Sequence, residues 1–292
     1  MDDELINYGG QAVIEGVMMR GRSSFAIAMR DPSGKIVTHS ETLGGIYKSR
    51  IAKIPFLRGL ILLWDSLGLG MRTLTISANI QTGEEEKIEG PTLYITLGIT
   101  ILVAMGFFFL VPAGIGYLSE HYLHLPNWIG NLVEGFVRLL FLIGYIWAVG
   151  FMPDIKRVFG YHGAEHKTIN AYEAGADLTP ENVSHYSVQH PRCGTAFLLT
   201  LALLSVIVFT LLGPMSLWWK FASRILLIPL IAGISYEYIR WTAKHLNSAF
   251  VRLLIKPNLA LQSLTTREPD LQMLEVAITA FKTMKASEDM LR

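Results

Sequence analysis

The sequence contains little cysteine and few charged residues, and both scarcities exclude classes of protein. Cys193 is the single cysteine among 292 residues, which excludes a fold built on intrachain disulfides. Charged residues make up 17% of the chain and the formal net charge is +1, so no basic field favours nucleic acid as a partner. The first residues are acidic and lack a basic segment followed by an apolar run, so we expect no cleavable signal peptide.

Long apolar runs dominate the chain instead. Hydrophobic residues make up 51% of it, and the mean hydropathy is positive. Four runs lie near residues 92–118, 132–152, 195–215 and 217–240. A helix needs about 20 residues to cross the hydrocarbon core, and each run approaches or exceeds that length. The sequence therefore predicts a mainly α, polytopic membrane protein with about four transmembrane helices and a small cytoplasmic β-hairpin unit.

Lysine and arginine are distributed unevenly among the predicted loops. The loop at 119–131 has none and the loop at 213–221 has only Lys220, whereas the loop at 153–194 and both terminal regions are rich in them. Basic loops stay in the cytoplasm. The expected location is the bacterial inner membrane, with both termini and the central loop on the cytoplasmic side.

The chain divides into four predicted regions. Residues 1–45 form a cytoplasmic β-containing unit, because a Pro-Ser-Gly turn separates two strand-like segments. Residues 46–90 form a basic amphipathic helix on the membrane surface and an acidic linker, although a helix packed on the β unit fits the pattern equally well. Residues 91–240 form the transmembrane domain, with a cytoplasmic motif loop at 153–194. Residues 241–292 form cytoplasmic C-terminal helices.

A polar stretch from Gly160 to Glu173 carries the candidate chemistry. His162 and His166 are four residues apart, so on a helix both rings lie on one face, where they can chelate one cation. Glu165 completes the order His-x-x-Glu-His, which is typical of the inverted zinc metallopeptidases. There two imidazoles hold zinc and the glutamate is the general base. Two solvated histidines on an ordinary helix would produce the same pattern.

A second polar cluster follows before the third apolar run. His190 and Cys193 have ligand spacing of their own, and a reduced cysteine is a good zinc ligand. Together with His162 and His166 they would close a tetrahedral structural site. If only three of the four bind, one position stays open for water or substrate. Alternatively, Cys193 is a small buried residue at a helix start.

Four further side chains are secondary candidates, as additional ligands or as partners of ligands: Glu173, Glu237, Glu15 and Arg192. Glu173 continues the face of the two histidines. Glu237 lies near the cytoplasmic end of the last apolar run, where a hydrogen bond to a neighbour is an equal alternative. Arg192 makes the loop electropositive and would suit a phosphate or lipid headgroup, but the topology alone explains its charge.

Charged residues also occur inside the apolar runs, where they are costly and usually paired. Glu134 and Arg138 are four residues apart in the second run. We expect them to satisfy each other or to pair with Arg224, in a structural role.

Three motifs together carry a family resemblance: GGQAVIEGVMMRG at 9–21, GYHGAEHKTINAYE at 160–173 and HPRCGT at 190–195. In this order they resemble the YqhQ-type family of bacterial membrane proteins, an uncharacterised family described as predicted metal-dependent enzymes. The resemblance extends over nearly the whole chain. It implies that the family's motif positions are His162, Glu165, His166, His190 and Cys193.

Two classes of function fit these observations. The first is a metal-dependent hydrolase at the cytoplasmic face, with Zn²⁺ held by His162, His166 and either Cys193 or His190, and with Glu165 as the base. The second is a non-enzymatic scaffold or accessory subunit of a membrane complex such as the protein-export machinery. The absence of a nucleophile elbow, a P-loop and a dinucleotide fingerprint favours the second. The lipid bilayer is the expected partner in both.

Overall fold

The computed structural model describes residues 8–43, 57–82 and 91–291, with side chains from residue 67 onward in the second segment and residue 95 onward in the third. The elements in chain order are β1 (Gly9–Val13), β2 (Gly16–Arg20), β3 (Ser24–Arg30), β4 (Ile36–Thr42), α1 (Leu57–Thr82), α2 (Pro91–Met105), the π-helix η4 (Gly106–Leu110), α3 (Val111–Tyr122), α4 (Asn127–Val149), α5 (Pro153–Glu173), α6 (Pro180–Ser184), α7 (Gly194–Thr210), α8 (Leu217–Leu226), α9 (Ile228–Lys244), α10 (Ala249–Thr265) and α11 (Leu271–Asp289). The described chain is therefore mainly helical, with one N-terminal sheet.

The sheet is a four-stranded antiparallel meander in the order β1-β2-β3-β4. The predicted hairpin is confirmed as β3 and β4. Its turn closes through the Gly34 amide, which donates to the Asp31 carbonyl at 2.9 Å. Gly34 has a φ of +84°, a left-handed conformation that glycine adopts without steric cost. Sequence-local turn chemistry thus sets this part of the fold.

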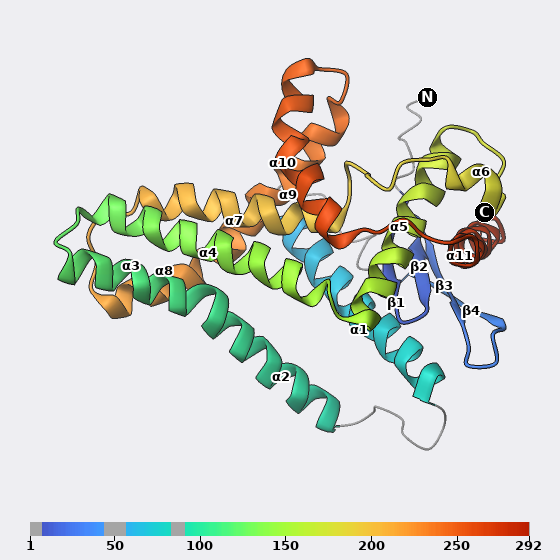
Figure 1. Ribbon diagram of the computed structural model, residues 1–292, viewed down its shortest axis with the longest axis horizontal. Coiled ribbons are helices and arrows are strands. Elements are labelled where there is room, and N and C mark those ends of the chain that lie inside the picture. The colour runs from blue at the N-terminus through green and yellow to red at the C-terminus, as the bar shows by residue number, and fades with distance from the viewer. Residues whose placement is uncertain (1–7, 44–56, 83–90, 292) are drawn as a thin grey trace.

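Side chains of β2 and β3 alternate between two apolar faces, as the period of a strand requires. One face packs against α1, through a cluster of Val13, Met18, Phe25, Ile27 and Met29. The other face packs against α5 and α11, through a cluster that includes Val17, Met19, Ala26 and Ala28. The sheet is thus the middle layer between α1 on one side and α5 with α11 on the other (Figure 1).

The packing of α1 bears on the helix expected at the membrane surface. Its residues Leu69, Leu74, Ile76 and Ile80 pack against the sheet cluster. This is the arrangement of the alternative, a helix packed on the β unit. The start of that predicted region and the acidic linker lie outside the described residues.

The apolar runs form long helices that extend away from the sheet (Figure 1). Two helices of the described chain are long and apolar enough to cross a membrane, Ile95–Tyr122 with 28 residues and Asn127–Val149 with 23. A third candidate is the pair α8 and α9, which is bent by 41°. The third apolar run, α7, is a shorter apolar helix of 17 residues. A membrane location with two to three candidate spans is therefore supported, and the count of about four goes beyond it.

The charged residues expected to pair within the spans do so. Glu134 of α4 accepts hydrogen bonds from Arg138 at 2.6 Å and from Arg224 of α8 at 2.5 and 2.9 Å. The remaining guanidinium donors bind Asn131, Ser205, Ser223 and the carbonyl of Phe108 in η4. We call Glu134, Arg138 and Arg224 the span triad. It ties α4 to α7, α8 and η4, which is the expected structural role.

Candidate metal centre

The polar motif lies on α5, which crosses from the end of α4 to the sheet (Figure 1). Pro153 occupies the first turn, where a missing amide hydrogen costs nothing. Gly175, with a φ of +73°, ends the helix by donating its amide to the Tyr172 carbonyl. Although polar, the motif residues from Gly163 to Ile169 are all buried. Their polar groups therefore need partners inside the protein.

His162 and His166 face each other on α5, as their spacing predicts. Their ring centroids are 4.4 Å apart. His162 Nδ1 lies 2.8 Å from the Thr265 carbonyl oxygen, and His166 Nδ1 lies 2.6 Å from the Val188 carbonyl oxygen. Because a carbonyl only accepts, each Nδ1 carries the hydrogen and each Nε2 keeps its lone pair. Both rings are thus held in the tautomer that ligates metal through Nε2.

Cys193 is the third member of the group. It is the N-cap residue of α7, and its Sγ lies 3.2 Å from His162 Nε2. One ligand atom each from His162, His166 and Cys193 lies within 4.8 Å of the others. Metal–ligand bonds of about 2.0–2.3 Å in a tetrahedral zinc site separate ligand atoms by roughly 3.3–3.8 Å. The group therefore needs only a small adjustment to hold one ion.

The Nε2 atom of His166 is the observation that tests the fit. It is buried and has no hydrogen-bond partner among the described residues. A buried nitrogen without a partner is costly, and in a native structure it indicates an ion or water. Two neutral imidazoles and a thiolate are a normal donor set for zinc. The residues present therefore fit a metal.

Glu165 lies against the same group. Its Oε2 is 3.9 Å from His162 Nε2 and 4.0 Å from His166 Nε2. Its side chain is only 6% exposed. A buried carboxylate near two lone pairs would be unfavourable without positive charge between them. Glu165 would therefore lie beside an ion held by this group.

His190 lies beside this group rather than within it. Its backbone is held by Gln262, which accepts from the His190 amide and donates to its carbonyl. Its ring centroid is 5.7 Å from that of His166, and burial lowers the pKa of His190. Its Nε2 lies 3.4 Å from Arg192, which pairs with Glu173. Of the two alternative third ligands, the structure groups Cys193 with the histidine pair.

The other secondary candidates are not among the grouped ligands. Glu15, at the turn between β1 and β2, binds Arg157 and Tyr161 on α5. The hydrogen bond from Arg157 holds the pKa of Glu15 below its ordinary value. Glu237 is on α9 and is not one of the grouped ligands. Glu173 and Arg192 form an ion pair beside His190.

Several residues outside the candidate ligand set hold the surrounding segments in place. The segment before Cys193 is fixed through its carbonyls: Lys167 donates to Ser184 and Tyr186, and Asn170 donates to Ser187 and Gln189. This places the Val188 carbonyl on His166. On the other side, a Cβ at Gly163 would overlap the Arg267 carbonyl, so this glycine admits the segment that carries Thr265. Lys167, Asn170 and Gly163 lie within the polar motif, so its composition was the available signal.

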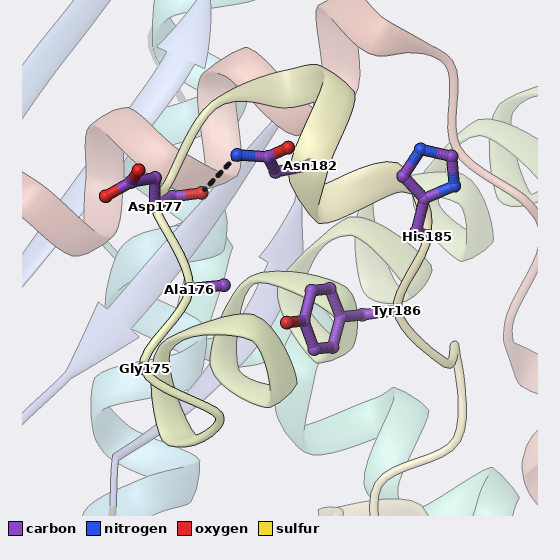
Figure 2. A pocket seen from close by; sticks show the side chains of 6 residues that line it. All are labelled: Gly175, Ala176, Asp177, Asn182, His185 and Tyr186. Carbon is purple, nitrogen blue, oxygen red and sulfur yellow. Dashed lines mark hydrogen bonds between the residues drawn. The ribbon is translucent and has the colours of Figure 1, made fainter.

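A separate hollow of about 540 Å³ lies on the loop that follows α5 (Figure 2). It is lined by Gly175, Ala176, Asp177, Asn182, His185 and Tyr186. Within it, the Asn182 amide donates to the Asp177 carbonyl at 3.4 Å. None of the grouped ligands lines this hollow.

Comparison with known proteins agrees with the resemblance drawn from the three motifs. Residues 54–287 match a family described as proteins of unknown function, DUF1385. The uncharacterized protein YqhQ of Bacillus subtilis (strain 168) is 35% identical over 297 residues, covering 95% of this chain and 92% of the relative. No solved structure matches the chain. The chain therefore belongs to the DUF1385 family, together with YqhQ.

Proposed function

We propose that this protein is a zinc-dependent hydrolase of the bacterial inner membrane, with its metal centre at the cytoplasmic face. The observation that carries the proposal is the buried His166 Nε2, which has no partner among the described residues and faces His162 and Cys193. The sequence order His-x-x-Glu-His adds a carboxylate at the position of a catalytic base.

Each residue has a distinct part in this proposal. His162, His166 and Cys193 would hold zinc, and the bound ion would supply Lewis-acid activation of a water and of an acyl or phosphoryl oxygen. Glu165 accepts the proton of the attacking water at Oε2, which lies about equally far from both histidine Nε2 atoms. The carbonyls of Thr265 and Val188 keep the imidazoles oriented.

The proposal includes the finer topology. α7 is counted as a fourth span with the two long helices and the bent pair, and both termini lie in the cytoplasm. The positive-inside distribution of lysine and arginine supports this orientation. Because Cys193 caps α7 and α5 follows directly after α4, the centre would then lie at the cytoplasmic surface of the bilayer.

Glu165→Gln is the test of the base role. The amide keeps the size of the side chain but cannot accept the proton, so hydrolysis of a chromogenic acyl or phosphoryl ester should fall by at least about 100-fold. Zinc measured by elemental analysis in saturating zinc should remain bound, because the three proposed ligands are intact. Loss of zinc from this variant would show that Glu165 is a ligand and would contradict the base role.

A specific observation also favours the second candidate, a zinc-stapled scaffold. The grouped side chains are largely buried, with His166 at 1% and Cys193 at 8% exposure, as in a structural site. In that case zinc would rigidify the segment before α7 as a docking surface. Wild-type protein that binds zinc, hydrolyses no ester and loses a copurifying membrane partner on Cys193→Ser substitution would favour the scaffold.

A further inference from the structure

The hairpin of β1 and β2 touches α5 at the glutamate of the metal centre. A Cβ added to Gly10 of β1 would lie 2.8 Å from Glu165 Cγ and 3.1 Å from Cδ. Real Cβ atoms essentially never approach another atom to within 3.0 Å. The side chain of Glu165 therefore packs directly against the backbone of Gly10. Any side chain at position 10 would displace its carboxylate.

Gly10 is not required by backbone conformation. The glycines with positive φ in the described chain are Gly34 and Gly175. Its neighbour Gly9 pairs in the same strand, and a Cβ there would meet nothing within 4 Å. The constraint at Gly10 is the close approach of Glu165 and of the Met18 carbonyl, which a Cβ would meet at 2.5 Å.

A second attachment fixes the turn of the same hairpin to α5. Glu15 adopts a φ of 53°, a left-handed conformation that is uncommon outside glycine. In this conformation its carboxylate accepts hydrogen bonds from Arg157 and, at 3.3 Å, from the Tyr161 hydroxyl. Tyr161 immediately precedes His162, so the strained turn is tied to the helix just before the first ligand.

We propose that the β1–β2 hairpin is a positioning element of the metal centre. Gly10 sets the place of the Glu165 carboxylate beside the two histidine Nε2 atoms, and the Glu15 pair holds the hairpin in that register. This gives a role to the N-terminal motif, which the proposed function does not use. The inference rests on the proposed function only in one respect. It uses zinc affinity to measure whether the Glu165 carboxylate is in place.

A double-mutant cycle on zinc affinity tests the proposal. Removing the nearby charge with Glu165→Gln should weaken zinc binding about 10-fold, measured by chelator competition. Gly10→Ala should weaken it similarly, and the double variant should be no weaker than either single one, because the carboxylate is lost only once. Gly9→Ala is the matched control and should bind like wild type. Two results would overturn the proposal. One is a loss of zinc affinity in the double variant equal to the product of the two single losses. The other is unchanged zinc affinity in Gly10→Ala.

Thermal unfolding without metal distinguishes failure of this proposal from failure of the proposed function. In chelator, Gly10→Ala should lower Tm, and truncation of Glu165 to alanine in that background should recover part of the loss by removing the overlap. No recovery would overturn the contact. Wild-type protein that binds no zinc would instead contradict the proposed function. The Tm comparison in chelator would remain a valid test of the contact between Gly10 and Glu165.

A gentler variant covers the case in which Gly10→Ala does not fold. Glu15→Asn keeps a residue that tolerates positive φ but removes the carboxylate that binds Arg157. It should weaken zinc binding several-fold, again without adding to Glu165→Gln. Additive effects in this cycle would overturn the positioning role of the hairpin.

Discussion

The protein contains two buried polar clusters that differ in one respect. In the span triad, every guanidinium nitrogen of Arg138 and Arg224 and both oxygens of Glu134 have a partner within hydrogen-bonding distance. At the candidate metal centre, His166 Nε2 has none among the described residues, and Glu165 Oε2 lies 3.9 and 4.0 Å from the two histidine Nε2 atoms. Both clusters are almost fully enclosed.

The difference distinguishes a cluster whose hydrogen bonds are complete from one that has an unpartnered buried nitrogen. Burial alone does not, because Glu134 and Arg224 are at 0% exposure and are explained entirely by each other and their neighbours. A cluster whose hydrogen bonds close on themselves holds helices together. A cluster that leaves a buried lone pair without a partner is a candidate site for a ligand.

The largest expected effect comes from breaking the span triad. Glu134→Gln leaves two buried guanidiniums without their counter-ion, and the loss of one partner of a buried ion pair costs about 3–5 kcal/mol. The measurement is unfolding of the detergent-solubilised protein. Glu275→Gln is the control, because its pair with Arg30 is exposed and should contribute less than about 1 kcal/mol. Equal losses in the two variants would contradict a structural role for the triad.

A smaller effect on the free energy of unfolding should come from zinc, and only when zinc is added. At a free concentration of 100 times the Kd, zinc should stabilise the wild type by about 2.7 kcal/mol, because it binds the folded state. In Cys193→Ser the ligand set is reduced and the shift should largely vanish, while a surface variant such as Glu275→Gln should keep it. A zinc-dependent shift of full size in Cys193→Ser would break the contrast between the two clusters.

The smallest effect should come from the surface pair of Glu15 and Arg157. The hydrogen bond from Arg157 lowers the pKa of folded Glu15 below the unfolded value of about 4.3. The stabilisation is therefore fully present above that value and is lost as pH falls through the folded pKa. Because both side chains are partly exposed, the loss should be below about 1 kcal/mol. Unfolding at pH 7 and pH 3 should show less acid sensitivity in Glu15→Gln than in wild type, and equal sensitivity would contradict the assignment.

Local pattern predicted much of the architecture. The hairpin of β3 and β4, the pairing of Glu134 with Arg138, and the shared face of His162 and His166 all follow from spacing over a few residues. Residues near one another in sequence are constrained by helix and turn geometry. Their contacts can therefore be predicted without knowledge of the fold.

Contacts between segments far apart in the sequence could not be predicted from local spacing. The choice of Cys193 over His190 depends on how the segment before α7 turns across α5. The orientation of the two imidazoles depends on the carbonyls of Val188 and Thr265, and a carbonyl leaves no mark in the sequence. The close approach of Gly10 to Glu165 spans more than 150 residues and arises from packing of the sheet on α5.

The central claim is that the unsatisfied lone pair of His166 belongs to a metal centre. Its most direct test is elemental analysis of purified wild-type protein beside His166→Ala and Cys193→Ser. The account predicts about one zinc ion per chain in the wild type and a loss of most of it in both variants, each of which removes one of three ligands. Wild-type protein without stoichiometric metal, or zinc retained in both variants, would contradict it.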